Sequence, residues 1–118
     1  MIEPAMHELS IIQSIIDIVL KDISKREVSK VERISLRIGE MRQVVPEALQ
    51  FSFECLSKNT PVEGARLDIE HVPLRGRCRS CQHEYVLTNW FEGCPECGNT
   101  KIDIVAGKEL EIVEYEGS

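Results

Sequence analysis

Four of the five cysteines in this chain are spaced in a way that suits the binding of a single metal ion. They form two Cys-x2-Cys pairs, Cys78 with Cys81 and Cys94 with Cys97, and twelve residues separate the pairs. Zn²⁺ prefers four ligands in a tetrahedron, and thiolates are among its usual ligands. Two intervening residues let one tight turn direct two sulfur atoms toward the same ion. The pattern therefore predicts a structural Zn(II) site made of four thiolates.

Disulfides and iron are the two alternatives to zinc for these cysteines. A pair of disulfides is not expected in a chain that stays in the reducing cytoplasm. An iron site of the rubredoxin type uses the same shell of four sulfur atoms and is left open. A closed shell of four thiolates has no position for a substrate water, which argues against hydrolysis at this metal. His83 lies between the pairs and is interpreted as a solvent-facing hairpin residue or as a competing ligand.

The two cysteine turns differ in composition. The second contains Pro95, which pre-sets a turn, and is followed by Gly98, which permits a positive φ close to the sulfur atoms. The first turn has no glycine and is expected to be the weaker of the two. Zinc is expected to supply most of the folding free energy of this segment, on the order of 10 kcal/mol in small zinc modules. The segment has few apolar side chains to bury: Leu74, Val86, Leu87, Trp90 and Phe91.

The periodicity of apolar residues predicts the elements that position these cysteines. Steps of three and four predict helices, and strict alternation predicts half-buried strands. The expected fold is α+β, with two helices on a three-stranded sheet and an inserted four-cysteine zinc-ribbon module. We expect residues 1–73 plus 108–118 to form one α/β domain and residues 74–107 to form the zinc module. The expected elements are helices over 8–26 and from Pro46 to about Ser57, and strands over 31–38, 65–72, 84–88 and 109–115.

Composition and charge exclude several classes of function. The chain has 118 residues, of which 14 are Lys or Arg and 20 are Asp or Glu, so its formal net charge is -6. Without a basic surface, nucleic-acid binding is not expected. No apolar run is long enough to span a membrane, and no signal peptide is evident, so we expect a cytoplasmic protein. No catalytic triad or phosphate-binding loop is present, and we expect no enzyme activity.

A second metal-binding candidate lies near the start of the chain, at His7. If translation begins at Met6, the free amine, the imidazole and backbone nitrogens of His7 and the backbone nitrogen of Glu8 can meet one ion. Ni²⁺ and Cu²⁺ favour such a planar set of nitrogens. The alternative is that His7 is an ordinary surface residue near a helix start.

Several motifs together resemble one protein family. The match extends from Met6 to the end of the chain, and the motifs occur in the family's order. The chain resembles the HypA/HybF family of nickel metallochaperones in Met6-His7-Glu8-Leu9-Ser10, Ile38-Gly39-Glu40, Val45-Pro46-Glu47-Ala48-Leu49, Glu63-Gly64-Ala65 and the cysteines Cys78, Cys81, Cys94 and Cys97.

This resemblance implies a nickel-binding domain, a structural zinc module and a role in metal delivery. It implies Ni(II) as transported cargo, with His7 and Glu8 as its ligands. The implied partners are a GTPase that inserts nickel and the large-subunit precursor of [NiFe]-hydrogenase, with urease maturation proteins as a further possibility. The resemblance leaves the oligomeric state open, including a weak homodimer.

The chain departs from the family pattern at its amino terminus, where five residues precede Met6. If Met1 to Ala5 stay attached, the free amine lies far from His7, and this form is expected to bind nickel more weakly. A zinc-ribbon adaptor of the transcription or translation machinery and an electron-transfer iron protein are the competing functions. The adaptor explains the cysteines but not the acidic charge balance.

Three further residues could do chemistry but have simpler interpretations. Cys55 is expected to be a small buried thiol on the second helix. His71 alternates with apolar residues and is expected to be half-buried in the sheet. Glu40 follows a strand and is either a solvated turn residue or a neighbour of His7.

Overall fold

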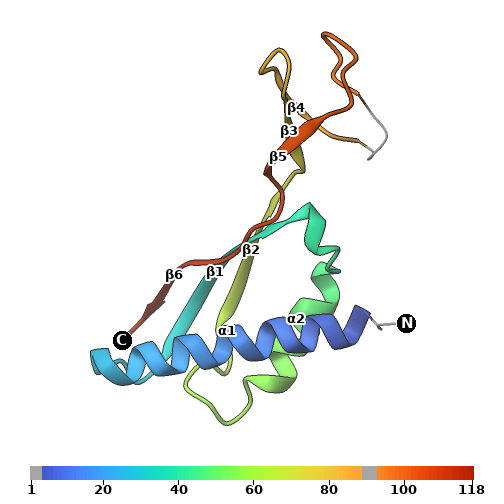
Figure 1. Ribbon diagram of the computed structural model, residues 1–118. Helices are drawn as coiled ribbons and strands as arrows, with labels where there is room; N and C mark the ends of the chain where they lie inside the picture. The colour runs from blue at the N-terminus through green and yellow to red at the C-terminus, as the bar shows by residue number, and fades with distance from the viewer. Residues whose placement is uncertain (1–3, 89–92) are drawn as a thin grey trace. The chain divides into compact units, whose positions relative to one another are not determined.

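A computed structural model describes residues 4–88 and 93–118, and for residues 4–7 it describes the backbone only. Trp90 and Phe91 therefore lie outside the described residues. The chain forms two compact units (Figure 1). The first runs from the amino terminus to Leu36 and includes Val44–Glu70 and Glu111–Ser118, and the second consists of Arg37–Gln43 and His71–Leu110. The predicted domain division near residues 73 and 108 stays a prediction, because a compact unit is not by itself an independently folding domain.

The first predicted helix is confirmed and begins four residues before its predicted start. Helix α1 spans Pro4–Arg26. Its apolar residues recur at steps of three and four and form one buried stripe, each no more than 4% exposed: Ile12, Ile15, Ile16, Val19 and Ile23. Lys25 and Arg26 occupy its last turn, where positive charge suits the helix dipole. Among the described residues, no helix combines the length and hydrophobicity that crossing a membrane requires.

The predicted three-stranded sheet is also confirmed. Strands β1 (Val31–Gly39), β2 (Arg66–Val72) and β6 (Leu110–Gly117) lie in the order β2-β1-β6. The central strand alternates as expected, with Ile34, Leu36 and Ile38 at most 1% exposed. Helix α2 (Pro46–Leu56) packs against α1. It begins at the predicted proline, and Asn59 beyond its end has the predicted left-handed backbone, with φ of 62°.

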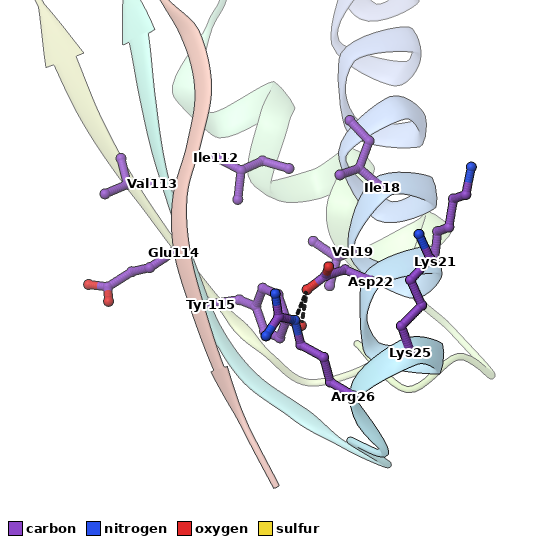
Figure 2. Close-up of a pocket in the computed structure, with 10 residues that line it drawn as sticks. All are labelled: Ile18, Val19, Lys21, Asp22, Lys25, Arg26, Ile112, Val113, Glu114 and Tyr115. Carbon is purple, nitrogen blue, oxygen red and sulfur yellow. Dashed lines mark hydrogen bonds and ion pairs between the residues drawn. The ribbon is translucent and has the colours of Figure 1, made fainter.

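Strand β6 runs antiparallel to β1. The N–H of Gly39 donates to the carbonyl of Glu109 at 2.8 Å, and the N–H of Ser118 donates to the carbonyl of Lys30 at 2.9 Å. The strict alternation predicted for β6 is wrong in its middle, because Ile112 and Tyr115 both face α1 (Figure 2). Because of this departure, Ile112 and Tyr115 both border the helix instead of lying on opposite faces of the strand.

One guanidinium group links all three strands of this sheet. Arg33 on β1 lies 3.3 Å from Asp68 on β2, and on β6 it lies 3.4 Å from Glu114 and 2.5 Å from Glu116. The hydrogen bond from Arg33 lowers the pKa of Glu116, and the positive charge of the same group adds to this effect. Arg33 therefore holds the acidic side chains of β6 to the rest of the sheet.

The second unit contains a smaller antiparallel sheet that carries the cysteine segment. It consists of β3 (Arg75–Cys78), β4 (Glu84–Val86) and β5 (Ile102–Ala106), in the order β4-β3-β5. Its hydrophobic core cluster contains Leu74, Cys78, Tyr85, Leu87 and Cys94. Only β4 was predicted, as residues 84–88. Strand β3 reads Arg-Gly-Arg-Cys and has no apolar alternation, whereas β5, in which Ile102 and Ile104 flank Asp103, was missed despite a short alternation. The predicted class, α+β with a small four-cysteine module, is confirmed.

A close approach of two glycines is needed where β1 ends within the second unit. A Cβ atom added to Gly39 would lie 2.1 Å from the carbonyl carbon and oxygen of Gly107. Backbone atoms cannot rotate away as a flexible side chain can. The segments around Gly39 and Gly107 must therefore separate if Gly39 gains a side chain.

We predict that Gly39→Ala lowers the free energy of unfolding by about 2 kcal/mol, because of this overlap. Urea denaturation would measure the loss. Gly64→Ala is the control, since Gly64 has φ of 79° but open space around its Cβ position. Backbone strain alone should cost the control about 1 kcal/mol. A smaller loss for Gly39→Ala than for Gly64→Ala would contradict the close approach.

Candidate metal centres

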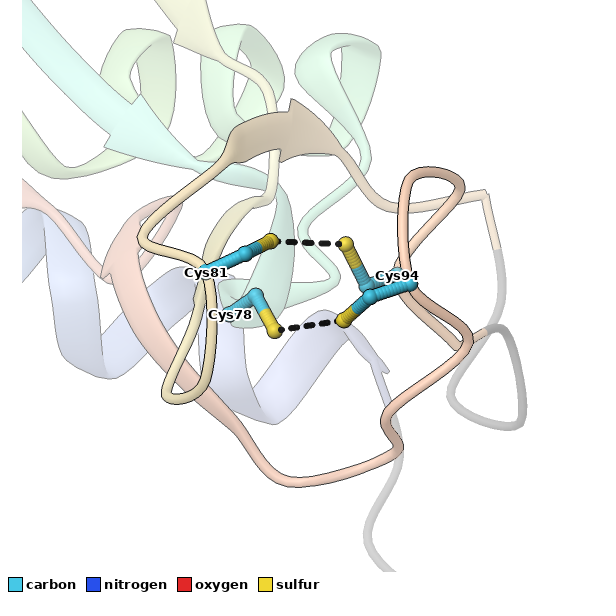
Figure 3. A group of neighbouring side chains, drawn as sticks. Cys78, Cys81 and Cys94 are labelled. Carbon is cyan, nitrogen blue, oxygen red and sulfur yellow. Dashed lines mark hydrogen bonds between the residues drawn. The ribbon is translucent and has the colours of Figure 1, made fainter.

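The four paired cysteines converge in space. Their sulfur atoms all lie within 4.8 Å of one another (Figure 3). The Sγ of Cys78 lies 3.5 Å from that of Cys97, and the Sγ of Cys81 lies 3.6 Å from that of Cys94. Tetrahedral Zn–S bonds of about 2.3 Å place sulfur atoms about 3.8 Å apart, whereas a disulfide holds them about 2.05 Å apart. The arrangement fits a zinc site and contains no disulfide.

The two cysteine turns have the same hydrogen bonds at the same spacing. In the first, the N–H of Cys78 donates to the carbonyl of His83 at 2.9 Å, and the N–H of Gln82 donates to the carbonyl of Cys78 at 3.0 Å. In the second, the N–H of Cys94 donates to Asn99 at 2.9 Å, and the N–H of Gly98 donates to Cys94 at 2.7 Å. Each turn therefore presents its two sulfur atoms in a similar way.

The lack of a glycine does not prevent the first turn from adopting the geometry of the second, and the expectation that it is the weaker turn stays a prediction. Gly98 has the predicted positive φ, 77°, but Gln82 adopts nearly the same conformation with φ of 67°. A side chain in this region costs about 1 kcal/mol. The first turn therefore reaches the same geometry and accepts some strain. The sequence gives no sign of this, because glutamine is not a typical left-handed residue.

Burial alternates within each pair, and the thiol pKa values diverge. Cys78 and Cys94 are buried, whereas Cys81 and Cys97 are exposed. Hydrogen bonds from the backbone N–H groups of Cys81 and Ser80 lower the pKa of Cys78 to about 7. For Cys81, a backbone hydrogen bond from His83 lowers the pKa, but desolvation and the neighbouring thiols outweigh it and raise the pKa to about 12. Metal binding at neutral pH must therefore displace protons from this cluster.

His83 does not join the sulfur cluster. Within the described ranges, the group of potential ligands consists of the four cysteines alone. The His83 ring is half-buried and stacks on Tyr85, with ring centroids 5.8 Å apart and planes 12° apart. His83, interpreted from the sequence as a solvent-facing hairpin residue, is thus partly shielded, because its ring stacks on a residue of the small core.

Two other expectations about isolated residues are wrong. Cys55 is exposed, not buried, and nearby Phe51 on the same helix is 67% exposed. Helix α2 turns both of these residues outward and buries Leu49 and Phe53 instead. His71 is exposed rather than half-buried.

The candidate nickel residues lie at the start of α1. The backbone of His7 is helical, and Glu8 is the first residue of the helix whose side chain is described. The Glu8 side chain is fully buried, and its Oε2 accepts a hydrogen bond from the N–H of Val45 at 2.9 Å. Its Oε1 is buried with no hydrogen-bond partner among the described residues. Glu40, the other acidic candidate, is exposed and belongs to the second unit.

The Glu8 geometry has a chemical consequence. A buried carboxylate oxygen without a partner is costly, and a cation or proton that binds it removes that cost. The second oxygen is fixed by the residue immediately before α2, so the carboxylate is held in place rather than free to rotate. The Glu8 side chain was named as a ligand only through the family resemblance, because nothing in the local sequence pattern reveals its contact with Val45.

Comparison with known proteins agrees with these observations. The family described as "Hydrogenase/urease nickel incorporation, metallochaperone, hypA" matches residues 6–117. A hydrogenase maturation factor HypA from Geotalea uraniireducens (strain Rf4) is 41% identical, with the match covering 94% of this chain and 98% of that protein. The protein of the same name from Geobacter metallireducens is 44% identical over the same shares.

Solved structures agree with the fold. A solution structure of a HypA protein superimposes with a TM-score of 0.72 at 25% identity, covering 96% of this chain and 97% of that one. The solution structure of the nickel metallochaperone HypA from Helicobacter pylori gives a TM-score of 0.66 at 24% identity, covering 93% and 96%. With the family match over nearly the whole chain, these findings show that this chain belongs to the HypA family of hydrogenase and urease nickel-incorporation metallochaperones.

Proposed function

We propose that this chain binds Ni(II) as cargo and delivers it during the maturation of [NiFe]-hydrogenase, with urease as a second acceptor. Family membership supports the general role in hydrogenase or urease maturation. The observation that carries the nickel proposal is the buried Glu8 carboxylate, which has one oxygen fixed and one without a partner among the described residues. Glu8 directly follows His7, so a carboxylate and an imidazole lie on adjacent residues.

His7 and Glu8 suit nickel chemically. An imidazole nitrogen and a carboxylate oxygen are both common ligands of divalent first-row metals. The hydrogen bond from Val45 orients the Glu8 carboxylate, as a neighbouring group commonly orients a metal ligand. The amine of Met6 adds to these ligands only in a chain that begins there. Release is easier from a site with few protein ligands than from a closed shell.

The four cysteines Cys78, Cys81, Cys94 and Cys97 are proposed to hold a structural Zn(II). Their sulfur positions support this assignment, because the separations suit a tetrahedron around one ion. A full set of protein ligands leaves no open position for substrate, so the zinc holds the second unit together and is not transferred. The protein is thus proposed to act as a carrier, with no catalytic residues. The competing adaptor function is not favoured by the family match.

The proposed partners follow from the delivery role. They are a GTPase that inserts nickel, the large-subunit precursor of [NiFe]-hydrogenase, and urease maturation proteins for the second acceptor. A net charge of -6 suits contact with basic protein surfaces better than contact with nucleic acid. We place this activity in the cytoplasm, where the four thiols stay reduced and able to bind zinc.

Removing one buried thiol should abolish the zinc site. We expect wild type and Cys55→Ser to hold about one zinc per chain, and Cys94→Ser to lose it. Cys55 is the control because its thiol is exposed and lies outside the cluster. Metal analysis measures the zinc. Amide NMR signals of β3, β4 and β5 should collapse in Cys94→Ser while those of α1 persist, and zinc retention in that variant would contradict the assignment.

Replacing the imidazole of His7 should weaken nickel binding without changing zinc binding. We expect His7→Ala to weaken nickel binding by more than about tenfold, since loss of even an outer-shell partner costs roughly that much. Its zinc content should not change. His71→Ala, at an exposed histidine, is the matched control and should bind both metals normally. Calorimetric titration measures nickel binding, and unchanged affinity in His7→Ala would exclude the imidazole as a ligand.

Two substitutions at Glu8 distinguish metal binding from structural support. Glu8→Gln keeps an oxygen that accepts from Val45 but removes the charge, so nickel binding should weaken about tenfold with little loss of stability. Glu8→Ala also leaves the Val45 N–H without its acceptor and should cost an additional 1–3 kcal/mol or so in unfolding free energy. Nickel titration and urea denaturation measure the two effects. Normal nickel affinity in Glu8→Gln would restrict Glu8 to a structural role.

A further inference from the structure

A groove of about 710 Å³ lies between α1 and β6, within the first unit (Figure 2). The helix contributes Ile18, Val19 and the charged residues of its last turns, and the strand contributes residues 112–115. None of the residues proposed to bind zinc or nickel lines it. The groove is therefore a surface that the metal-binding role does not use.

The strand that borders this groove has an open edge. β6 lies at the end of the strand order β2-β1-β6, and the described part of the chain places no strand on its other side. An edge strand presents backbone N–H and C=O groups that can pair with another extended segment. A helix beside such an edge forms the kind of channel in which peptides add as an extra strand.

The groove also offers apolar surface next to that edge. Val19 forms a buried part of its floor, and Ile112 is partly buried beside it. Ile18 is 58% exposed on the helix border. The side chains of Ile18 and Ile112 would lose contact with water if an extended segment lay in the groove. Val113 points away from the helix and does not contribute (Figure 2).

The charges on the helix side are positive and not fully compensated. The Oδ2 of Asp22 accepts hydrogen bonds from Tyr115 at 2.5 Å and from Arg26 at 2.9 Å, so this oxygen is already engaged. Lys21 and Lys25 also line the groove, are exposed, and form no ion pair within the part of the chain that the structure describes. The helix border therefore suits a carboxylate on whatever occupies the groove.

The opposite face of β6 is acidic. Glu114 and Glu116 point toward Arg33 on the face of the sheet away from the groove. The strand from Leu110 to Gly117 contains three glutamates and no lysine or arginine. Two copies of β6 that paired with each other would bring like charges together, which destabilises such a pair. A second copy of this chain is therefore a poor occupant.

We propose that the open edge of β6 binds an extended segment of a partner protein by strand addition. The inward side chains of that segment are apolar and acidic, so that they contact Ile18 and Ile112 and approach Lys21 and Lys25. Its outward side chains are neutral or basic, so that they lie beside Glu114 rather than repel it. Backbone hydrogen bonds supply affinity in this mode, and the alternating side chains supply specificity.

A designed peptide tests the proposal on the zinc-loaded full chain. The probe is fluorescein-labelled Thr-Val-Lys-Glu-Lys-Val-Thr, in which valine and glutamate alternate with lysine. Fluorescence anisotropy should show saturable binding, and amide exchange measured by NMR should slow in β6. A control peptide with lysine in place of glutamate should bind about tenfold more weakly, because it brings a positive charge to the lysine border.

Backbone methylation of the probe distinguishes strand addition from simple adhesion. Adjacent residues of a strand direct their N–H groups to opposite edges. N-methylation at the two lysines and N-methylation at the two valines therefore block different edges of the peptide. One of these peptides should lose binding and the other should keep it. Equal binding by both, or no binding by the unmethylated probe, would overturn the proposal.

Paired charge reversals locate the site on the protein. Lys21→Glu with Lys25→Glu should weaken probe binding about tenfold, whereas the matched reversals Lys30→Glu with Lys58→Glu, also at exposed lysines, should not. Equal effects of the two double variants would overturn the proposal. All four substitutions lie outside the proposed metal ligands, so zinc and nickel binding should be unchanged. Failure here would therefore be distinct from failure of the nickel-delivery proposal.

Discussion

The convergence of four sulfur atoms within 4.8 Å of one another is the main constraint on the fold of the second unit. Few apolar residues support this region, and the described core around the cluster includes two of the cysteines themselves. Deprotonated thiolates at such separations repel one another unless a cation lies among them. Two turns with matching hydrogen bonds and the short sheet β4-β3-β5 serve mainly to bring the sulfur atoms together. The fold of this unit and its proposed metal are thus parts of one equilibrium.

The first unit obtains its stability differently. Its buried helix stripe and central strand form an aliphatic core that needs no ion. The fully buried Glu8 is the main polar exception, and it joins the start of α1 to the residue before α2 through one hydrogen bond. Polar groups that are buried and incompletely paired are commonly kept for function at some cost in stability. That pattern is why Glu8, rather than an exposed acidic residue such as Glu40, carries the argument for cargo binding.

Sequence analysis predicted the long elements well, because α1, β1 and α2 have strong apolar periodicity and a proline at the helix start. It also predicted which cysteines converge, since two closely spaced pairs are typical of ligands that share one ion. Strand β3 was missed because Arg-Gly-Arg-Cys has no apolar alternation, and β5 was missed although Ile102 and Ile104 alternate around Asp103. Cys55 was misplaced because a thiol is compatible with either side of a helix. The left-handed conformation of Gln82 and the contact between Glu8 and Val45 could not be predicted from the sequence. Both depend on tertiary context that no local preference records.

The alternation of burial within each cysteine pair would make one side of the proposed zinc site more accessible to solvent than the other. Cys78 and Cys94 are shielded, whereas Cys81 and Cys97 face solvent. A competing chelator or an oxidant arriving from solution meets these two sulfur atoms first, one from each turn. A bound metal ion would then be lost in steps, in which Cys81 and Cys97 detach before Cys78 and Cys94. At the proposed zinc site, resistance to oxidation would therefore depend on two residues rather than four.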